Sequence, residues 1–312
     1  RLSLVGSEMC IRDRQNSGLG NIVNPYVSLL HKEIYNIPFV LLIGWRGEPN
    51  KQDEPQHKVQ GRITEDLLKL LEIDYIYFDE KSILEEIIEK IETYTKKKKP
   101  LAILVKKDSF KKDSRVFEND QSLSTRSDAL KKIIGFFGSK AIYISTTGKL
   151  SRELYSLRQI EEELNNDLYV VGGMGHASSI ALGILESEKK KNIVCLDGDG
   201  SLLMHMGQLS LIADKKYKNF YHIVFNNSSH ESVGGQPNLY SKINSDQLFK
   251  SFGYETIIGI NSIEELDKLQ LEKIKAPAYI DIKVQNFSSS SLPRPGDEIQ
   301  KYKDLFIEKL NE

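Results

Sequence analysis

Short apolar runs alternate with longer amphipathic stretches along most of the chain. The runs are rich in Val, Ile and Leu and have the length of strands, whereas the stretches repeat apolar residues at helical spacing. This alternation is typical of parallel sheets with helices on both faces. The predicted strands span 39–43, 75–78, 101–105, 141–145, 168–171, 193–196, 221–225 and 278–283. The predicted helices span 64–71, 83–95, 126–136, 150–165, 177–185, 202–215 and 245–252.

A polar stretch at 106–124 contains few apolar residues and interrupts the alternation. We interpret 108–125 as a linker between an incomplete domain at 15–107 and a second domain at 126–312, which carries a C-terminal tail. Two domains also agree with the length of 312 residues, because one domain usually contains about 100–200 residues. The predicted fold class is therefore α/β, with two parallel-sheet domains.

The first 14 residues, RLSLVGSEMCIRDR, fit neither a secretory signal nor the pattern of a helix or strand. The codons of Met9–Arg14 resemble an adapter used in preparing sequencing libraries. We therefore interpret residues 1–14 as adapter-derived, and expect native sequence to begin near Gln15 with the first domain truncated.

Composition excludes several classes of protein. Lys and Arg total 43 against 44 Asp and Glu, a net charge of −1, so a nucleic-acid partner is not expected. No apolar run approaches the ~20 residues that span a bilayer. A disulfide framework is excluded because the chain has 2 cysteines, and we expect Cys195 to be buried. These features predict a soluble, cytoplasmic protein.

Two turns that follow predicted strands carry oxygen-rich side chains. Asp199 lies in the glycine-rich turn 197–201, ahead of a predicted helix whose free N–H groups attract anions. A carboxylate would repel a phosphate there unless a hard cation such as Mg²⁺ lay between them. Asn226 and Asn227 end the next predicted strand, at the same sheet edge. The sequence thus predicts a site for Mg²⁺ and a diphosphate.

The pair of motifs, GDG at 198–200 and NN at 226–227, resembles the cofactor motif of thiamine-diphosphate enzymes. The resemblance implies two thiamine-diphosphate-binding-fold domains: an incomplete pyrimidine-binding domain at 15–107 and a diphosphate- and Mg²⁺-binding domain at 126–312. It implies that Mg²⁺ is bound by the side chains of Asp199 and Asn227 and by the Ser229 carbonyl. It also implies that Met174 props the cofactor into its bent form. The cofactor-binding residues it implies are Thr147, Gly148, Gly173, Met174, Gly175, His176, Gly198, Asp199, Gly200, Ser201 and Asn227.

Longer strings narrow the resemblance. The chain is similar to phosphonopyruvate decarboxylases in QNSGLGN (15–21), GWRGEP (44–49), DEPQH (53–57), TTGKLSREL (146–154), GMGHASSIALGI (173–184), NNSSHESVGGQP (226–237) and LPRP (292–295). This family implies decarboxylation of 3-phosphonopyruvate to phosphonoacetaldehyde and CO₂ in phosphonate biosynthesis, by a carboxy-lyase. It also implies a homodimer or higher homo-oligomer. The chain departs from the family pattern at Ser228 and Ser229, where Gly-Ala is common, and at Gly296.

The substrate of that family is a small 2-oxo acid with a distal phosphonate. Resemblance and charge together make Arg46, Arg62 and Arg294 the candidates for holding its anionic groups. His57 and His230 are the candidates for proton transfer, although each is also compatible with a purely structural role. The family's usual activating Glu belongs upstream of the Gln15 string and is expected to be absent from this chain.

Three alternatives stay open at this point. Sulfopyruvate decarboxylase, or another 2-oxo-acid decarboxylase, differs in the distal anion of its substrate. A nicotinamide-dependent oxidoreductase would use the Gly173-x-Gly175-x-x-Ser178 turn, with Asp197 ending the next predicted strand. A non-catalytic subunit would keep the fold without the reaction.

Overall fold

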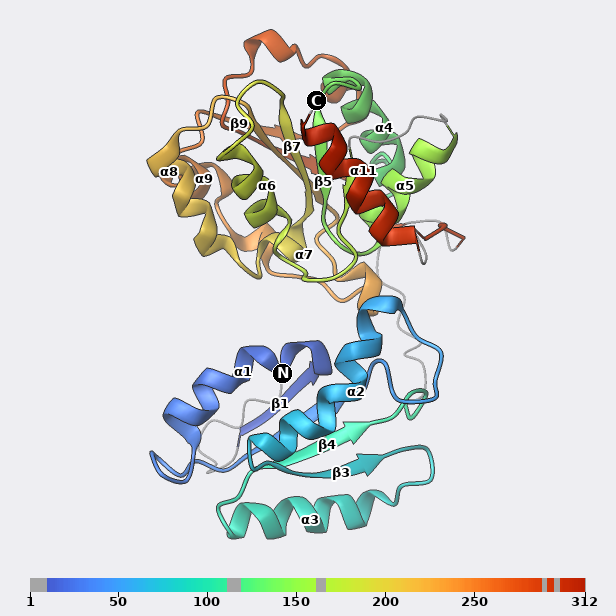
Figure 1. The fold of residues 1–312 in the computed structure, drawn as a ribbon, viewed down its shortest axis with the longest axis vertical. Coiled ribbons are helices and arrows are strands. Elements are labelled where there is room, and N and C mark those ends of the chain that lie inside the picture. Colours follow the sequence, from blue (N-terminus) through green and yellow to red (C-terminus); the bar gives the residue numbers. More distant parts are fainter. Residues whose placement is uncertain (1–9, 111–118, 161–166, 288–290, 295–297, 312) are drawn as a thin grey trace. The chain divides into compact units, whose positions relative to one another are not determined.

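The structure is a computed structural model that describes residues 10–110, 119–160, 167–287, 291–294 and 298–311. Its internal contacts divide the chain into two compact units, residues 1–114 and 115–312. The division falls inside the segment 108–125 interpreted as a linker, and each unit contains one sheet (Figure 1). The assignment of the two units to the pyrimidine and diphosphate halves of a cofactor stays a prediction.

The sheet of unit 1 has four parallel strands in the order β1-β2-β4-β3. The strands are β1 (Cys10–Gln15), β2 (Phe39–Gly44), β3 (Asp74–Phe78) and β4 (Leu101–Val105). The helices are α1 (Gly20–Pro25), which continues into a π-helical turn at Tyr26–Leu30, α2 (Pro55–Leu70) and α3 (Leu84–Lys96).

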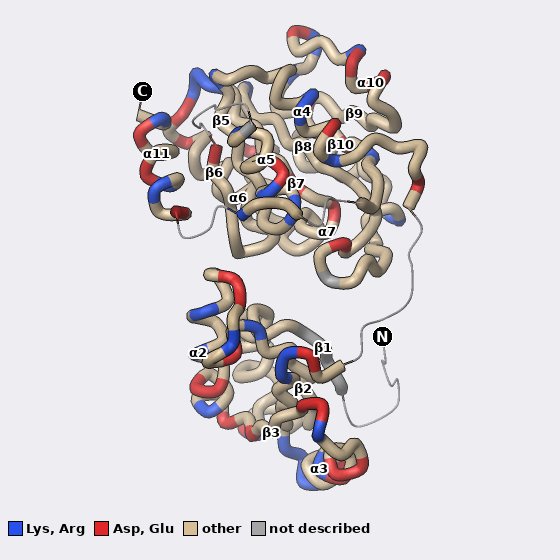
Figure 2. The backbone as a smooth tube through the Cα atoms, turned by 90° about the vertical axis from the view of Figure 1, so that its right-hand side faces the viewer, with Lys and Arg blue, Asp and Glu red and all other residues tan. Residues whose placement is uncertain are grey.

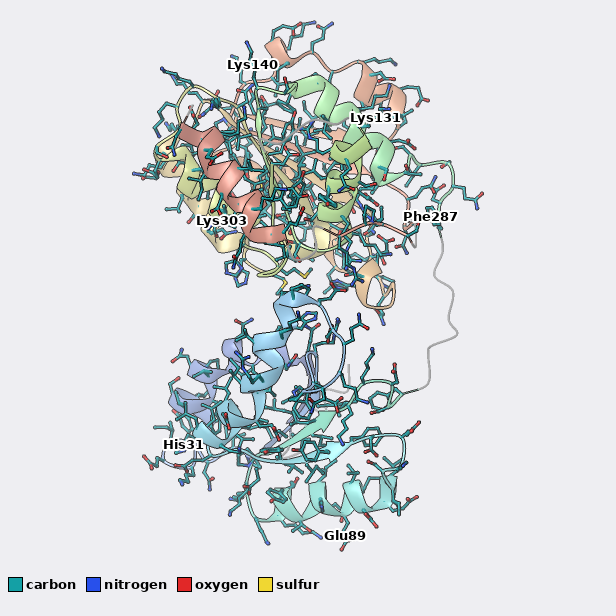
Figure 3. The ribbon with its side chains drawn as sticks, turned by 45° about the vertical axis from the view of Figure 1, so that its right-hand side comes forward. His31, Glu89, Lys131, Lys140, Phe287 and Lys303 are labelled. Carbon is teal, nitrogen blue, oxygen red and sulfur yellow. The ribbon has the colours of Figure 1, made fainter. Side chains whose placement is uncertain are left out.

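Alternating residues of β2 point to opposite faces of this sheet. Phe39, Leu41 and Ile43 pack in a cluster with residues of α2, whereas Val40 packs in a second cluster with Ile87 of α3. The outer side of α3 carries interleaved acidic and basic positions (Figure 2), and Glu89 lies on its exposed side (Figure 3). The amphipathic pattern of α3 thus follows from its place on the sheet.

Strand β1 corrects the interpretation that residues 1–14 contain no strand. Its residues pair in parallel with β2, from Cys10 opposite Phe39 to Gln15 opposite Gly44. β1 lies at the edge of the sheet and pairs through its backbone, so it needs no regular apolar pattern. Residues 1–9 lie outside the described residues.

The sheet of unit 2 has six parallel strands in the order β6-β5-β7-β8-β10-β9. The strands are β5 (Ile142–Ser145), β6 (Asp167–Tyr169), β7 (Ile193–Gly198), β8 (Phe220–Asn226), β9 (Thr256–Ile260) and β10 (Ala278–Lys283). The α-helices are α4 (Arg126–Phe137), α5 (Lys149–Ile160), α6 (Ala177–Leu185), α7 (Asp199–Leu202), α8 (Ser210–Lys215), α9 (Ser245–Ser251), α10 (Ile263–Asp267) and α11 (Ile299–Asn311). Short 3-10 turns lie at Met206–Leu209, Glu231–Val233, Tyr240–Lys242 and Leu271–Lys273.

Two apolar clusters cover the two faces of this sheet. Val194 and Leu196 of β7 pack with α4 and α5, whereas Ile193 and Cys195 pack with α6, α8 and α9. Lys131, on the exposed side of α4, points away from the core (Figure 3). The predicted α/β class with parallel sheets covered on both faces is confirmed. Among the described residues, no helix is long and apolar enough to cross a membrane.

Most predicted elements are present, and the differences have physical causes. The helix predicted at 202–215 is wrong as one element, because the chain leaves helical geometry at His205 (φ −139°, ψ 40°) between α7 and α8. The helix predicted from Thr64 begins at Pro55, where proline occupies the first turn. The sequence analysis also missed β9, α10 and α11. Residues 161–166, at the end of the helix predicted at 150–165, lie outside the described residues.

Candidate cofactor and active site

The carboxyl ends of β5 and β7 border a cavity of about 260 Å³ in unit 2. β6, the strand that follows β5 in sequence, lies on one side of β5, and the next strand, β7, lies on the other side. Ligands of open α/β sheets bind where the strand order reverses in this way. The cavity brings together many of the residues predicted to bind cofactor or metal or to transfer protons. They are Thr147, Gly148, Met174, Gly198, Asp199, Gly200, Ser201, Asn227, Ser229 and His230.

A larger hollow of about 550 Å³ lies in unit 1. Its lining includes Asp74 and Pro100, at the amino ends of β3 and β4. This is the edge opposite to the one where open parallel sheets bind ligands, so we place the candidate site in the smaller cavity.

Asp199 begins α7 and is 3% exposed. Its Oδ1 accepts a hydrogen bond from the Gly200 N–H at 2.7 Å. Its Oδ2 is buried and accepts no hydrogen bond among the described residues, although the Asn238 amide and the Ser228 N–H lie near enough to lower the pKa of the carboxyl against the larger effect of burial. Burial raises the pKa of this carboxyl above its usual value. A buried carboxylate oxygen that lacks a donor suits a cation ligand.

Asn227 and Ser229 lie in the turn that follows β8. The Asn227 Oδ1 accepts the Ser229 N–H at 3.1 Å, and the Asn227 Nδ2 donates to Glu231 at 3.4 Å. The Ser229 Oγ is buried without a partner among the described residues. Together with Asp199, this turn offers amide, hydroxyl and carboxylate oxygens around one cavity, a donor set that fits Mg²⁺.

Ser201 connects three turns around the cavity. Its hydroxyl lies 2.7 Å from the Thr146 Oγ1, and it accepts the Gly175 N–H at 3.0 Å. Gly175 has φ +89°, and a Cβ there would lie 2.6 Å from the His205 ring and 2.9 Å from the Met204 Cβ. Glycine is therefore required at this position.

Gly173 and His176 belong to the same turn but are not among the lining residues of the cavity. The His176 Nδ1 lies 3.1 Å from the Gly173 carbonyl, and its ring packs on His205 with 4.3 Å between the centroids. Met174, by contrast, lines the cavity and is 37% exposed. A large apolar side chain in the lining of the cavity suits contact with a bound ring.

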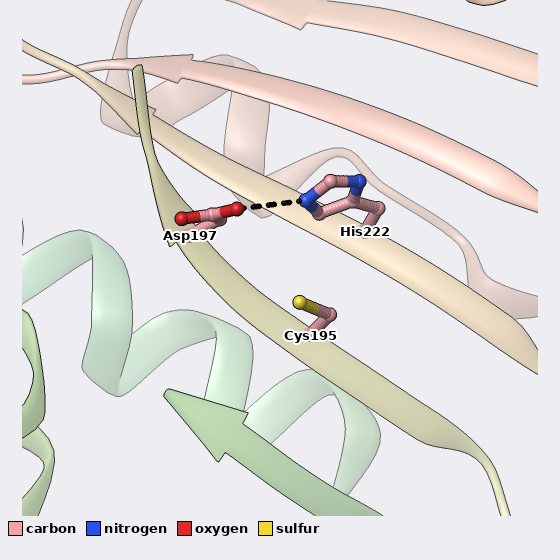
Figure 4. A group of neighbouring side chains, drawn as sticks. All are labelled: Cys195, Asp197 and His222. Atoms are coloured by element: carbon pink, nitrogen blue, oxygen red, sulfur yellow. Dashed lines mark hydrogen bonds and ion pairs between the residues drawn. The ribbon is translucent and has the colours of Figure 1, made fainter. Parts of the chain in front are cut away.

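Cys195 and Asp197 of β7 and His222 of β8 form a fully buried cluster (Figure 4). The His222 Nε2 lies 3.4 Å from the Asp197 Oδ2, and its Nδ1 lies 2.8 Å from the Tyr254 hydroxyl. The other Asp197 oxygen accepts the Gly198 N–H at 2.9 Å. Because both imidazole nitrogens already have partners, the cluster supports the Asp199 turn rather than a metal. The expectation that Cys195 is buried is confirmed, and burial raises the pKa of its thiol.

A network of four charged residues borders the cavity and escaped the sequence analysis. Arg126 binds both carboxylate oxygens of Glu153, at 2.8 and 2.9 Å, and reaches Glu231 at 3.0 Å. Lys149 binds the other Glu231 oxygen at 2.9 Å. Burial raises the pKa of Glu153 against the opposing effect of Arg126. These residues are far apart in sequence, so the fold alone reveals the network.

In unit 1, the structure brings two predicted residues together on a carboxylate that the sequence analysis did not select. Asp53 binds Arg46 through Nε at 2.8 Å and Nη2 at 2.5 Å, and lies 3.0 Å from the His57 Nδ1. Arg62 is exposed on α2. In unit 2, Arg294 is exposed and does not line the cavity.

Known proteins resemble both parts of the chain. Residues 146–282 match the thiamine pyrophosphate enzyme, C-terminal TPP binding domain; thiamine pyrophosphate is another name for thiamine diphosphate. Phosphonopyruvate decarboxylase of Streptomyces hygroscopicus is 31% identical over 90% of this chain and 73% of its own length. Phosphonopyruvate decarboxylase of Streptomyces viridochromogenes is 30% identical over 90% of the chain and 74% of its own length.

A relative with a different named substrate matches a smaller part of the chain. Sulfopyruvate decarboxylase subunit beta of Methanocaldococcus jannaschii is 39% identical over 46% of this chain and 73% of its own length.

Proposed function

Because this chain belongs to the phosphonopyruvate decarboxylase family of thiamine-diphosphate-dependent enzymes, we propose that it decarboxylates 3-phosphonopyruvate to phosphonoacetaldehyde and CO₂. The chain is a decarboxylase, and therefore a carboxy-lyase. The phosphonate substrate, the Mg²⁺ ion and a place in phosphonate biosynthesis are the proposed parts. The observation that carries the proposal is the identity of 31% and 30% to the two Streptomyces enzymes over 90% of the chain, against 26% to the sulfopyruvate decarboxylase of Methanosarcina acetivorans over 92% of the chain.

In this proposal the turn of unit 2 holds the cofactor through the metal. The donorless Asp199 Oδ2 would bind Mg²⁺ together with the Asn227 side chain and the Ser229 carbonyl. Gly200 and Ser201 would meet the diphosphate at the start of α7, and Met174 would support the ring system. Bound thiamine diphosphate supplies the thiazolium ring that stabilises the carbanion left by loss of CO₂.

The residues of unit 1 would act on the substrate in this account. Arg46 is held on one edge by Asp53, which leaves the Nη1 edge of its guanidinium for an oxyanion. His57 is the first candidate for proton transfer, and His230, at the cavity of unit 2, is the second. Arg62 and Arg294 remain candidates for the second anionic group of the substrate.

Sulfopyruvate decarboxylation is the second candidate function. The 39% identity to a sulfopyruvate decarboxylase beta subunit supports it, although that match covers less than half of this chain. The nicotinamide-dependent oxidoreductase is set aside by the family assignment. An association of two or more identical subunits and a cytoplasmic location are further parts of the proposal.

Initial rates with three 2-oxo acids test the substrate. Phosphonopyruvate, sulfopyruvate and pyruvate are compared at saturating thiamine diphosphate and Mg²⁺, with CO₂ release as the readout. We apply the assay to the 312-residue chain and to a version extended by the coding sequence upstream of it. If kcat/KM is highest with phosphonopyruvate, the result supports the proposal. If kcat/KM is highest with sulfopyruvate, the result supports sulfopyruvate decarboxylation instead.

A further inference from the structure

One carboxylate in unit 1 receives five hydrogen-bond donors from the loop after β2 and the start of α2. Asp53 accepts from the Arg46 Nε and Nη2, from the Gly47 and Glu54 N–H groups at 2.7 Å each, and from the His57 Nδ1. Its side chain is 13% exposed. The Arg46 guanidinium, followed by the other donors, holds the pKa of Asp53 far below its usual range. Asp53 is therefore an anion that organises its surroundings.

Asp53 fixes the plane of the Arg46 guanidinium. The two parallel bonds to Nε and Nη2 form a bidentate pair, which has a defined geometry. Among the described residues, the Arg46 Nη1 has no partner, and the side chain is 43% exposed. The outer edge of the guanidinium thus faces solvent in a fixed orientation, ready for an oxyanion.

Asp53 also selects the tautomer of His57. A carboxylate can only accept at Nδ1, whereas the Gln15 amide nitrogen, 3.3 Å from Nε2, can only donate. The imidazole therefore carries its proton on Nδ1 and presents the lone pair of Nε2 to Gln15. A group that displaces the Gln15 amide would meet this nitrogen.

The loop that carries Arg46 is tightly packed against α2. A Cβ on Gly47, which has φ +69°, would lie 1.9 Å from the His57 carbonyl oxygen, and a Cβ on Gly61 would lie 1.8 Å from the Gly47 oxygen. Asn16 donates to the Arg46 carbonyl at 2.7 Å. These close approaches fix the backbone on both sides of the Asp53 contacts.

We propose that Asp53 is a positioning residue of the substrate site, which holds the Arg46 guanidinium and the His57 imidazole as one unit for a 2-oxo acid with a distal dianionic group. Arg46 would bind the dianion through its outer edge, and His57 would exchange a proton at Nε2. This inference rests on the proposed function for the identity of the substrate. The tautomer of His57 and the orientation of Arg46 are independent of it.

Asp53→Asn tests the inference, with Asp66→Asn as the matched control. Asp66 lies on the same helix, α2, and its exposed carboxylate binds Lys69 at 3.0 Å, so the control also removes a paired charge. In the chain labelled with ¹⁵N-histidine, we expect His57 to show the Nδ1–H tautomer. This signature should be lost in Asp53→Asn and kept in Asp66→Asn.

Kinetics separate positioning from folding. We expect kcat/KM for phosphonopyruvate to fall about 10- to 100-fold in Asp53→Asn, in the range typical of lost positioning contacts, and to stay unchanged in Asp66→Asn. A Nε2–H tautomer of His57 in the unsubstituted chain would overturn the inference, and so would equal kinetics of the two variants. Because the tautomer of His57 is measured in the unsubstituted chain, this test holds even if Asp53→Asn does not fold. If the unsubstituted chain shows the Nδ1–H tautomer but neither it nor the version extended upstream turns over phosphonopyruvate, the proposed function fails while the arrangement around Asp53 stands.

Discussion

The carboxylate of Asp199 accepts the N–H of Gly200 through Oδ1 at 2.7 Å, and its buried Oδ2 accepts no hydrogen bond from the residues that the structure describes. A folded protein rarely buries such an atom unless something else uses it. The cost is a charged group in a poorly solvated place, as the raised pKa of Asp199 shows. The proposed Mg²⁺ would contact this same atom. The arrangement therefore lowers the stability of the free protein and favours binding of the metal.

Asp199→Asn should therefore stabilise the free protein and abolish its response to metal. The substitution removes a buried charge, and with it the repulsion from nearby Asp281, but also removes the oxygen proposed for Mg²⁺. Thermal melting at neutral pH should show a higher Tm than the unsubstituted chain, by about 2–4 °C for each kcal/mol gained. Adding thiamine diphosphate and Mg²⁺ should raise the Tm of the unsubstituted chain and leave the variant unchanged.

Asp281→Asn is the control for that experiment. Asp281 is half-buried on β10, burial raises its pKa, and it does not line the cavity. Its substitution should also stabilise the free protein while preserving the response to thiamine diphosphate and Mg²⁺. An Asp199→Asn variant that keeps the full ligand response would contradict the metal assignment.

The raised pKa of Asp199 also sets the direction of a pH dependence. A carboxyl whose pKa is higher in the folded than in the unfolded protein stabilises the fold below the unfolded pKa, and this contribution is lost as pH rises through the folded pKa. Stability of the unsubstituted free protein should decline over that interval more than stability of Asp199→Asn. Urea unfolding across pH 4–8, roughly the interval above the usual Asp pKa, measures the difference. Parallel curves of stability against pH for the two proteins would show that the pKa of the Asp199 carboxyl is not raised.

Gly175→Ala should destabilise unit 2. The residue has φ +89°, and the added Cβ would approach both His205 and Met204 too closely. A non-glycine residue in such a conformation costs about 1–3 kcal/mol before the clash is counted. Gly183→Ala on α6 is the control, since its Cβ would meet no atom within 4 Å and alanine favours helices. Melting curves should move in opposite directions, and equal Tm values would contradict the packing described for the 173–176 turn.

Arg126→Met should destabilise the protein by about 3–5 kcal/mol, because it leaves Glu153 buried without its cation. The double substitution Arg126→Met with Glu153→Met should recover most of that loss. Urea titration of the three proteins measures the free energy of unfolding. If the double variant were less stable than the single one, Glu153 would have another partner that matters more than Arg126.

Arg46→Lys should lower kcat/KM for phosphonopyruvate more than kcat/KM for pyruvate. Lysine keeps the positive charge but loses the fork that binds Asp53 on one edge and the proposed phosphonate on the other. Losing charged hydrogen bonds worth about 1.5–3 kcal/mol lowers kcat/KM for phosphonopyruvate by about 10- to 150-fold. Pyruvate, which has no distal dianion, should lose less. Equal losses with both acids would assign Arg46 to holding the loop.

The sequence predicted the parts of the molecule that depend on local pattern. The strands Phe39–Gly44 and Ile193–Gly198 are buried apolar runs, and the turn carrying Asp199 follows from glycines at fixed spacing. These features need no knowledge of distant residues. The edge strand Cys10–Gln15 was missed because it pairs through its backbone and its sequence has no regular apolar pattern.

Contacts between distant residues could not be predicted in the same way. Arg126 and Glu231 are 105 residues apart in sequence, and only the fold places them 3.0 Å apart. Asp53 was inside a recognised string, yet its charge gave no sign that it would bind Arg46 and His57 together. An acidic residue in a polar loop is usually solvated, so its role appears only when its partners are located.

Phosphorus NMR of 3-phosphonopyruvate incubated with the protein tests the central claim most directly. The 312-residue chain and the version extended upstream are each incubated with thiamine diphosphate and Mg²⁺, with thiamine diphosphate alone, with Mg²⁺ alone, and with neither. We predict that a phosphonoacetaldehyde resonance grows in at least one version when both cofactors are present, and that it is absent when either is withheld. Unchanged phosphonopyruvate in both complete reactions, under conditions where sulfopyruvate is consumed, would contradict the account.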